Sequence, residues 1–122
     1  NYLQYNFHYI NDQSYKSVNV KGIMLMENKN KKCNSKKLQI SKEIESSINF
    51  KDKDIAIDIN HVDKSGKSLI DRIKFIVVGG NIEVACWKWS KAIKKNKPWR
   101  DTLQVSIRTD VFNKWLYNEA YK

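Results

Sequence analysis

The chain has 122 residues, a hydrophobic fraction of 41% and a formal net charge of +10. This length fits a single domain, residues 1–122, and the apolar content is enough for a packed core, which excludes global disorder. The longest apolar runs, such as Phe75–Val78, are too short to span a bilayer. The excess of lysine and arginine indicates an acidic partner, which is nucleic acid, an anionic membrane surface or an acidic protein.

The first half of the chain mixes strand patterns with a lysine-rich segment. Apolar residues alternate over Tyr2–Ile10, which predicts a strand, and a second strand is expected at Tyr15–Met26. Glu27–Lys37 contains five lysines and is interpreted as a loop. A short strand is expected at Leu38–Ile40. The pattern of Ser41–Phe50 is ambiguous, because its isoleucines are spaced for one face of a helix.

The second half of the chain is patterned as a series of strands. Asp54–Val62 alternates cleanly between apolar and polar residues, and Leu69–Val78 is apolar and β-branched, as expected of a strand inside a sheet. A Gly-Gly-Asn sequence then predicts a hairpin turn into a strand at Ile82–Trp89. A basic loop follows, and the last strand is expected at Thr102–Thr109.

These elements predict a mainly β fold. We expect a β-sandwich of about six or seven antiparallel strands, with an α+β arrangement as the alternative. Asp110 is placed to cap a short C-terminal helix that carries Phe112, Trp115 and Leu116.

The two cysteines, Cys33 and Cys86, are expected to form a disulfide if the protein is exported. Cys33 lies in a polar segment, where a free thiol would be exposed, whereas Cys86 lies in an apolar strand. The alternative is two free thiols in a cytosolic protein. Because the chain begins at Asn1 and strand patterning begins at once, we expect Asn1 to start a mature chain whose leader was removed, although trimming explains the missing methionine equally well.

No motif predicts catalysis, a metal site or a cofactor. The Gly-Lys-Ser sequence at 66–68 resembles the end of a phosphate loop, but His61 stands where that loop needs its first glycine, which favours a plain turn. His61 lies near Asp58 and Asp63 without the spacing of a metal site or a calcium loop. The sequence therefore predicts a protein that is not an enzyme and needs no cofactor.

The most distinctive segment is residues 87–100, which contains three tryptophans and six basic residues and no acid. Tryptophan and arginine dominate protein interfaces, and aromatic rings among cations also suit nucleic acid. A third interpretation has the tryptophans covering a sheet face while the lysines are solvated. The candidate binding residues are Trp87, Lys88, Trp89, Lys91, Lys94, Lys95, Lys97, Trp99 and Arg100.

Several short stretches resemble the periplasmic immunity lipoproteins that neutralise phospholipase effectors of type VI secretion. The resemblance lies in the strand–turn–strand from Tyr5 to Gly22, the glycine turn at 79–81, Cys86, Trp99 and the alternating strand Leu103–Ile107. The family's doubled cysteine is single here, and residues 27–70 have no counterpart. The resemblance implies a membrane-anchored β-sandwich whose loops plug the active-site cleft of a toxin.

Three hypotheses follow. The first is an exported bacterial inhibitor, periplasmic or anchored to the outer membrane through a removed or lipidated N-terminus, that binds and blocks an acidic protein such as a toxin effector. The second is a basic nucleic-acid-binding protein that uses residues 87–100, for which we expect only weak, non-specific contacts. The third is a small hydrolase or toxin with an unrecognised site.

Overall fold

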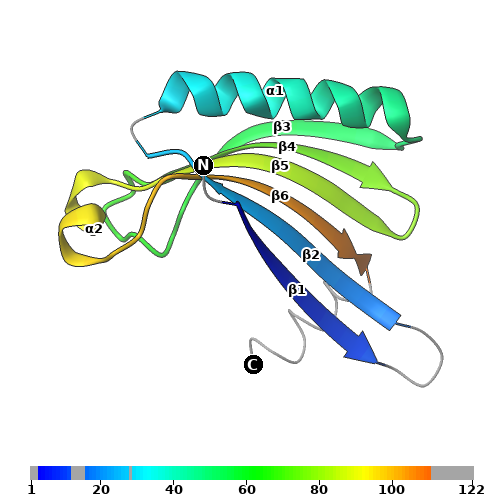
Figure 1. Ribbon diagram of the computed structural model, residues 1–122, viewed down its shortest axis with the longest axis horizontal. Helices are drawn as coiled ribbons and strands as arrows, with labels where there is room; N and C mark the ends of the chain where they lie inside the picture. The colour runs from blue at the N-terminus through cyan, green and yellow to red at the C-terminus, as the bar shows by residue number, and fades with distance from the viewer. Residues whose placement is uncertain (1–2, 12–15, 28, 111–122) are drawn as a thin grey trace.

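The computed structural model describes residues 3–11, 16–27 and 29–110 (Figure 1). Their elements follow the order β1 (Leu3–Asn11), β2 (Lys16–Leu25), α1 (Asn30–Ser47), β3 (Asp52–Ile59), β4 (Leu69–Val77), β5 (Gly80–Lys88), α2 (Lys91–Asn96) and β6 (Thr102–Thr109). The six strands form one antiparallel sheet in the order β1-β2-β6-β5-β4-β3. The mainly β, antiparallel fold expected from the alternating patterns is confirmed.

The strands form one open layer, and within the described residues the second sheet of the expected sandwich is absent. The helix α1 lies across one face of the sheet (Figure 1) and packs mainly against β5 and β6. This crossing follows from the topology, because β2 lies beside β6 while β3 lies at the far edge of the sheet. The connection between β2 and β3 must therefore pass over the sheet, and α1 is the part of it that covers the core.

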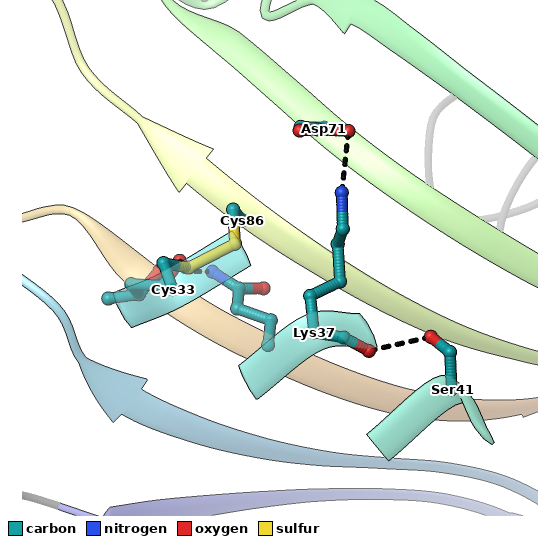
Figure 2. Close-up of a disulfide and its surroundings, with 7 residues drawn as sticks. Cys33, Lys37, Ser41, Asp71 and Cys86 are labelled. Atoms are coloured by element: carbon teal, nitrogen blue, oxygen red, sulfur yellow. Dashed lines mark hydrogen bonds and ion pairs between the residues drawn. A yellow bond between two sulfur atoms is a disulfide. The ribbon is translucent and has the colours of Figure 1, made fainter. Parts of the chain in front are cut away.

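The expected loop at Glu27–Lys37 and the expected strand at Leu38–Ile40 are wrong, since most of this region forms α1. The buried positions of α1 follow helical spacing, but they hold Cys33, Lys37 and Ser41. The ammonium group of Lys37 reaches Asp71 on β4 at 2.9 Å, and the hydroxyl of Ser41 donates a 2.7 Å hydrogen bond to the carbonyl of Lys37 (Figure 2). The helix was missed because two of its three fully buried positions, Lys37 and Ser41, hold polar residues.

The core lies between α1 and the centre of the sheet. Val84, Leu103, Met26 and Cys33 are all buried there, and partly buried side chains from α1 and β2 pack around them. Cys33 on α1 forms the expected disulfide with Cys86 on β5, and their Cα atoms are 6.1 Å apart, within the usual range (Figure 2). The disulfide therefore fixes the N-terminal half of α1 to the middle of the sheet.

The expected hairpin between β4 and β5 is confirmed. Gly79 has φ of +81°, a backbone conformation that side chains other than glycine rarely adopt. Gly80 lies against the carbonyl group of Arg108 on β6, so that a Cβ atom would clash with that backbone. The C-terminal helix expected after Asp110 falls in residues 111–122, which lie outside the described residues.

Candidate binding surface

Residues 87–100 comprise the last two residues of β5 and most of the connection to β6, at one end of the sheet, on the left of Figure 1. The segment expected to be a basic loop contains the short helix α2. Ser90 precedes this helix, and its hydroxyl accepts a 3.3 Å hydrogen bond from the backbone N–H of Ile93, as an N-cap residue does. This cap and the ion pairs described below give the segment a defined shape.

The three tryptophans of this segment form one cluster. Trp87 lies on the face opposite α1, because its neighbour Cys86 faces α1 and side chains alternate along a strand. The ring centroids of Trp87 and Trp89 are 6.2 Å apart, and those of Trp89 and Trp99 are 4.7 Å apart. All three side chains are half-buried. The ammonium groups of Lys21 and Lys97 lie over the outer two rings, Trp87 and Trp99, at 5.6 and 5.8 Å.

Two hollows open beside the cluster. The tryptophan groove has a volume of about 390 Å³ and is lined by Ile23, Val62, Trp87, Trp89, Trp99, Arg100, Thr102 and Gln104. The lysine hollow has a volume of about 600 Å³ and is lined by Ser65, Lys67, Lys88, Trp89, Ser90, Lys91, Ala92, Lys95 and Asn96. Trp89 lines both. The lysine hollow has four ammonium groups and no carboxylate in its lining, so its electrostatic potential is positive.

One ion-pair network holds residues 87–100 against the end of β2. The ammonium group of Lys94 lies 2.8 Å from Glu27 and 2.9 Å from the buried carboxylate of Asp101. Asp101 also accepts a 2.9 Å hydrogen bond from the backbone N–H of Trp89. The hydrogen bond from Lys94 lowers the pKa of Glu27. Burial lowers the pKa of Lys94, but its hydrogen bonds to Glu27 and Asp101 outweigh burial and raise it overall.

A second network joins the loop between β3 and β4 to the start of α2. Ser68 has no exposed surface, and its hydroxyl donates a 2.6 Å hydrogen bond to the carboxylate of Asp63. The same hydroxyl accepts a 2.8 Å bond from the backbone N–H of Ser90. Asp63 also accepts from the N–H of Ser65 at 3.0 Å. These bonds bring Lys67 beside the lysines of α2, which forms the lysine hollow.

The structure separates Lys94 from the other candidate residues. The ammonium group of Lys94 is ion-paired with Glu27 and Asp101. Lys94 therefore positions residues 87–100 and does not contact a partner. The remaining candidates lie around the two hollows or over the cluster. Lys67, Lys21, Ile23 and Val62 were not among the candidates, because they come from other parts of the chain. The basic turn at residues 64–68 was the only sequence signal, and it was interpreted as a plain turn.

The described residues contain no group of three or more histidine, cysteine or acidic side chains placed to hold a metal ion. His61 is exposed in the loop between β3 and β4. Neither described helix is long and apolar enough to cross a membrane.

The buried carboxylate of Asp63 should make stability depend on pH. Hydrogen bonds from Ser68, and then from Ser90 and Ser65, hold the pKa of Asp63 well below its usual value. A depressed pKa contributes stability that is present above the unfolded value of about 3.9 and is lost as pH falls through the folded value. The variant Asp63→Asn should therefore melt below the wild type at pH 7, and the difference should shrink below about pH 4.

Thermal melts from pH 7 down to pH 2 test this expectation. The exposed Glu43→Gln on α1 is the control, and its melting temperature should follow the wild type at each pH. A difference between Asp63→Asn and the wild type that is the same at every pH would contradict the assignment.

Comparison of the chain with protein-family models, with curated proteins and with solved structures finds no significant match.

Proposed function

We propose that the protein is a non-enzymatic binding protein that blocks an acidic protein partner, such as a toxin effector, through the end of the sheet that carries α2. The observation that carries this proposal is the preformed surface at residues 87–100. Half-buried tryptophans lie beside a hollow with four lysines, and hydrogen bonds from the backbone N–H groups of Trp89 and Ser90 hold both in place. A surface that is ordered before binding loses less conformational entropy when the partner docks.

The two hollows suit different parts of the binding process. The tryptophan groove offers apolar area with Arg100 at its side, the combination that supplies most binding energy at protein interfaces. The lysine hollow carries Lys88, Lys91 and Lys95 on exposed positions, from which they attract an acidic surface and speed its approach. The same end of the sheet therefore supplies both attraction and anchoring.

Export is part of this proposal. The disulfide between Cys33 and Cys86 is consistent with an oxidising, exported compartment, since such bonds are rare in the cytosol. We assign the protein to the periplasm or to the outer membrane, where it would meet an incoming effector before that effector reaches its target.

A co-expression assay tests the proposal. Each gene adjacent to the one for this protein is expressed with a periplasmic leader, and growth is recorded with and without this protein. We expect one adjacent product to stop growth, and we expect this protein to restore it and to co-purify with that product. A variant without the cluster, Trp89→Ala with Trp99→Ala, should fail to restore growth. If no adjacent product binds the purified protein, the inhibitor assignment is wrong.

Nucleic acid is the competing partner, and the tryptophan geometry argues against it. Stacking on a base needs a free ring face, and the ring of Trp89 already has the tilted rings of Trp87 and Trp99 beside it, with centroids 6.2 and 4.7 Å away. We expect single-stranded DNA to bind with a dissociation constant of about 10⁻⁴–10⁻⁶ M, and the affinity to fall steeply with salt, as it does for non-specific phosphate contacts. Fluorescence anisotropy between 50 and 200 mM salt, roughly the range in which this loss is largest, measures it. Nanomolar binding to one sequence at physiological salt would favour nucleic acid instead.

A further inference from the structure

The strand β3 leaves one edge of the sheet open. It is the last strand in the sheet order, and no described residue pairs with its outer side. The backbone N–H of Asn60 donates to the carbonyl of Ser68 at 2.8 Å. This bond shows which residues of β3 direct their backbone groups towards β4 and which direct them away from it. Even-numbered residues of β3 therefore bond to β4, and the odd-numbered residues turn their N–H and C=O groups outward. The outward groups belong to Lys53, Ile55, Ile57 and Ile59.

The same three isoleucines form an exposed apolar stripe. Their side chains lie on the α1 face, and their exposed fractions are 66% for Ile55, 65% for Ile57 and 49% for Ile59. The neighbouring Leu69 is 36% exposed, and with Ile57 it lines an apolar hollow of about 240 Å³ that reaches the disulfide. Edge strands with exposed apolar side chains pair readily with another strand, and most proteins prevent this by placing charged residues on the edge. In β3 the charged side chain on this face is Lys53, at the end of the strand away from Ile59.

The charge around β3 is lower than that of the rest of the chain, so two copies can approach each other at this edge with little electrostatic repulsion. The chain has a net charge of +10, so most of its surface repels a second copy. Around β3, however, three carboxylates are balanced by three cations, because Asp52, Asp54 and Asp58 lie near Lys53 on the same strand and near Arg72 and Lys74 on β4. Arg72 on β4 is ion-paired with both Asp54 and Asp58. Locally the edge is close to neutral.

The sequence of β3 is also complementary to itself in one register. A two-fold axis through Ile57 pairs it with Ile57 of the other copy and places Ile55 opposite Ile59. On the other face, Ala56 meets Asp58 and Asp54 meets Asn60, so no carboxylate faces a carboxylate. Shifting the pairing by two residues places Asp58 opposite Asp54 in one direction and opposite Asp58 of the other copy in the other direction. Two like charges then meet in either case, so the register centred on Ile57 is preferred.

We propose that β3 is a homodimer interface, at which two copies of the chain join edge to edge so that their described strands form one twelve-stranded antiparallel sheet centred on Ile57. The outward N–H and C=O groups of residues 55–59 bond across the axis, and the isoleucines of the two copies pack side by side. The interface is centred on β3, whereas the proposed binding surface is centred on α2 and the tryptophan cluster, and a negative result for one does not decide the other. Because one strand pair buries an area at the small end of protein interfaces, the dissociation constant should be roughly 10–100 µM.

Sedimentation equilibrium of the full chain tests the proposal between about 5 µM and 1 mM, a range that brackets that constant. We expect the average mass to rise from the monomer value of 14.4 kDa towards twice that value as concentration increases. The variant Ile57→Lys should raise the dissociation constant by about tenfold or more, because two ammonium groups then meet on the axis. The control is Val78→Lys, at an 84% exposed position outside β3, and it should dimerise as the wild type does.

A charge-pairing experiment tests the register. Separately, Ile55→Lys and Ile59→Glu should each weaken the dimer, because a lone charge then faces an isoleucine. An equimolar mixture should recover dimer, since the introduced lysine of one copy faces the introduced glutamate of the other only in the proposed register. Thermal melts confirm that each variant is folded. A monomer at every concentration, a dimer that Ile57→Lys leaves unchanged, or a mixture that dimerises no better than its components would each overturn the proposal.

Discussion

The double variant Cys33→Ser with Cys86→Ser is expected to melt about 15 °C below the wild type. The disulfide joins residues 53 positions apart. Closing a loop of that length lowers the entropy of the unfolded chain, which is worth about 4 kcal/mol, and for a domain of this size that corresponds to roughly 15 °C. Two of the three fully buried positions of α1 are the polar Lys37 and Ser41, and its Ile40 and Ile44 are only partly buried, so apolar packing alone holds α1 weakly to the sheet. We therefore expect α1 to detach first.

Differential scanning calorimetry measures the change, and reduction of the wild-type protein provides a second route if the variant does not fold. The reduced protein should melt at the same lowered temperature as the double variant. Thiol titration of the denatured, unreduced protein from its native compartment should find no free thiol. Two free thiols, or a reduced protein that melts with the oxidised one, would contradict this prediction.

The second large effect is expected on binding. Trp99→Ala should weaken the complex with the cognate partner by a factor of roughly 30 or more, because truncating an aromatic anchor of an interface typically costs about 2 kcal/mol or more. Trp99 lines the tryptophan groove and packs against Trp89, with Lys97 over its ring. Pro98 restricts the backbone beside it, which lowers the entropy lost on binding. Isothermal titration calorimetry gives the change in affinity.

Two controls separate anchoring from folding and from attraction. Leu38→Ala, an exposed apolar position on α1, should leave the affinity unchanged. Lys91→Ala with Lys95→Ala should mainly slow association at low salt, because exposed cations act over distance and salt screens them. Lys94 is left out of this pair, since its loss would also disturb Asp101. If Trp99→Ala unfolds the protein, or leaves both stability and affinity unchanged, Trp99 is not an interface anchor.

The strands could be predicted because each carries its own signal. Alternation along a strand is a local property, and the glycine turn before β5 needs only two adjacent residues. Helix α1 could not be predicted in the same way. The buried positions of Lys37 and Ser41 look solvent-exposed in the sequence, and the group that accepts the charge of Lys37 is Asp71, on a different strand.

In the candidate site, too, the features that depend on neighbouring residues could be predicted, whereas those that depend on distant residues could not. The tryptophans and most of the lysines are contiguous in the sequence, so their composition indicated a surface. Lys67 joins that surface only because Ser68 bonds to Ser90 at a separation of 22 residues. Lys94 was assigned to the surface because residues 87–100 contain no acid, but Asp101, just beyond them, and Glu27, just after β2, both pair with its ammonium group. Long-range partners of this kind are visible only after the chain has folded.

The sheet order has a consequence for the path of folding. Strands β3 to β5 follow one another as neighbours, and β6 joins β5 after the segment that holds α2, so each can pair with the preceding one after a short connection. The pair of β2 with β6 instead joins an early strand to the last described one, and it closes the largest loop in the sheet. Pairings that span more of the chain form later, because more entropy is lost before any bond forms. We therefore expect β3 to β6 to assemble first and the β1–β2 hairpin to dock last. The Cys33–Cys86 bond then forms after these four strands have paired, and it links α1 to a sheet that is already in place.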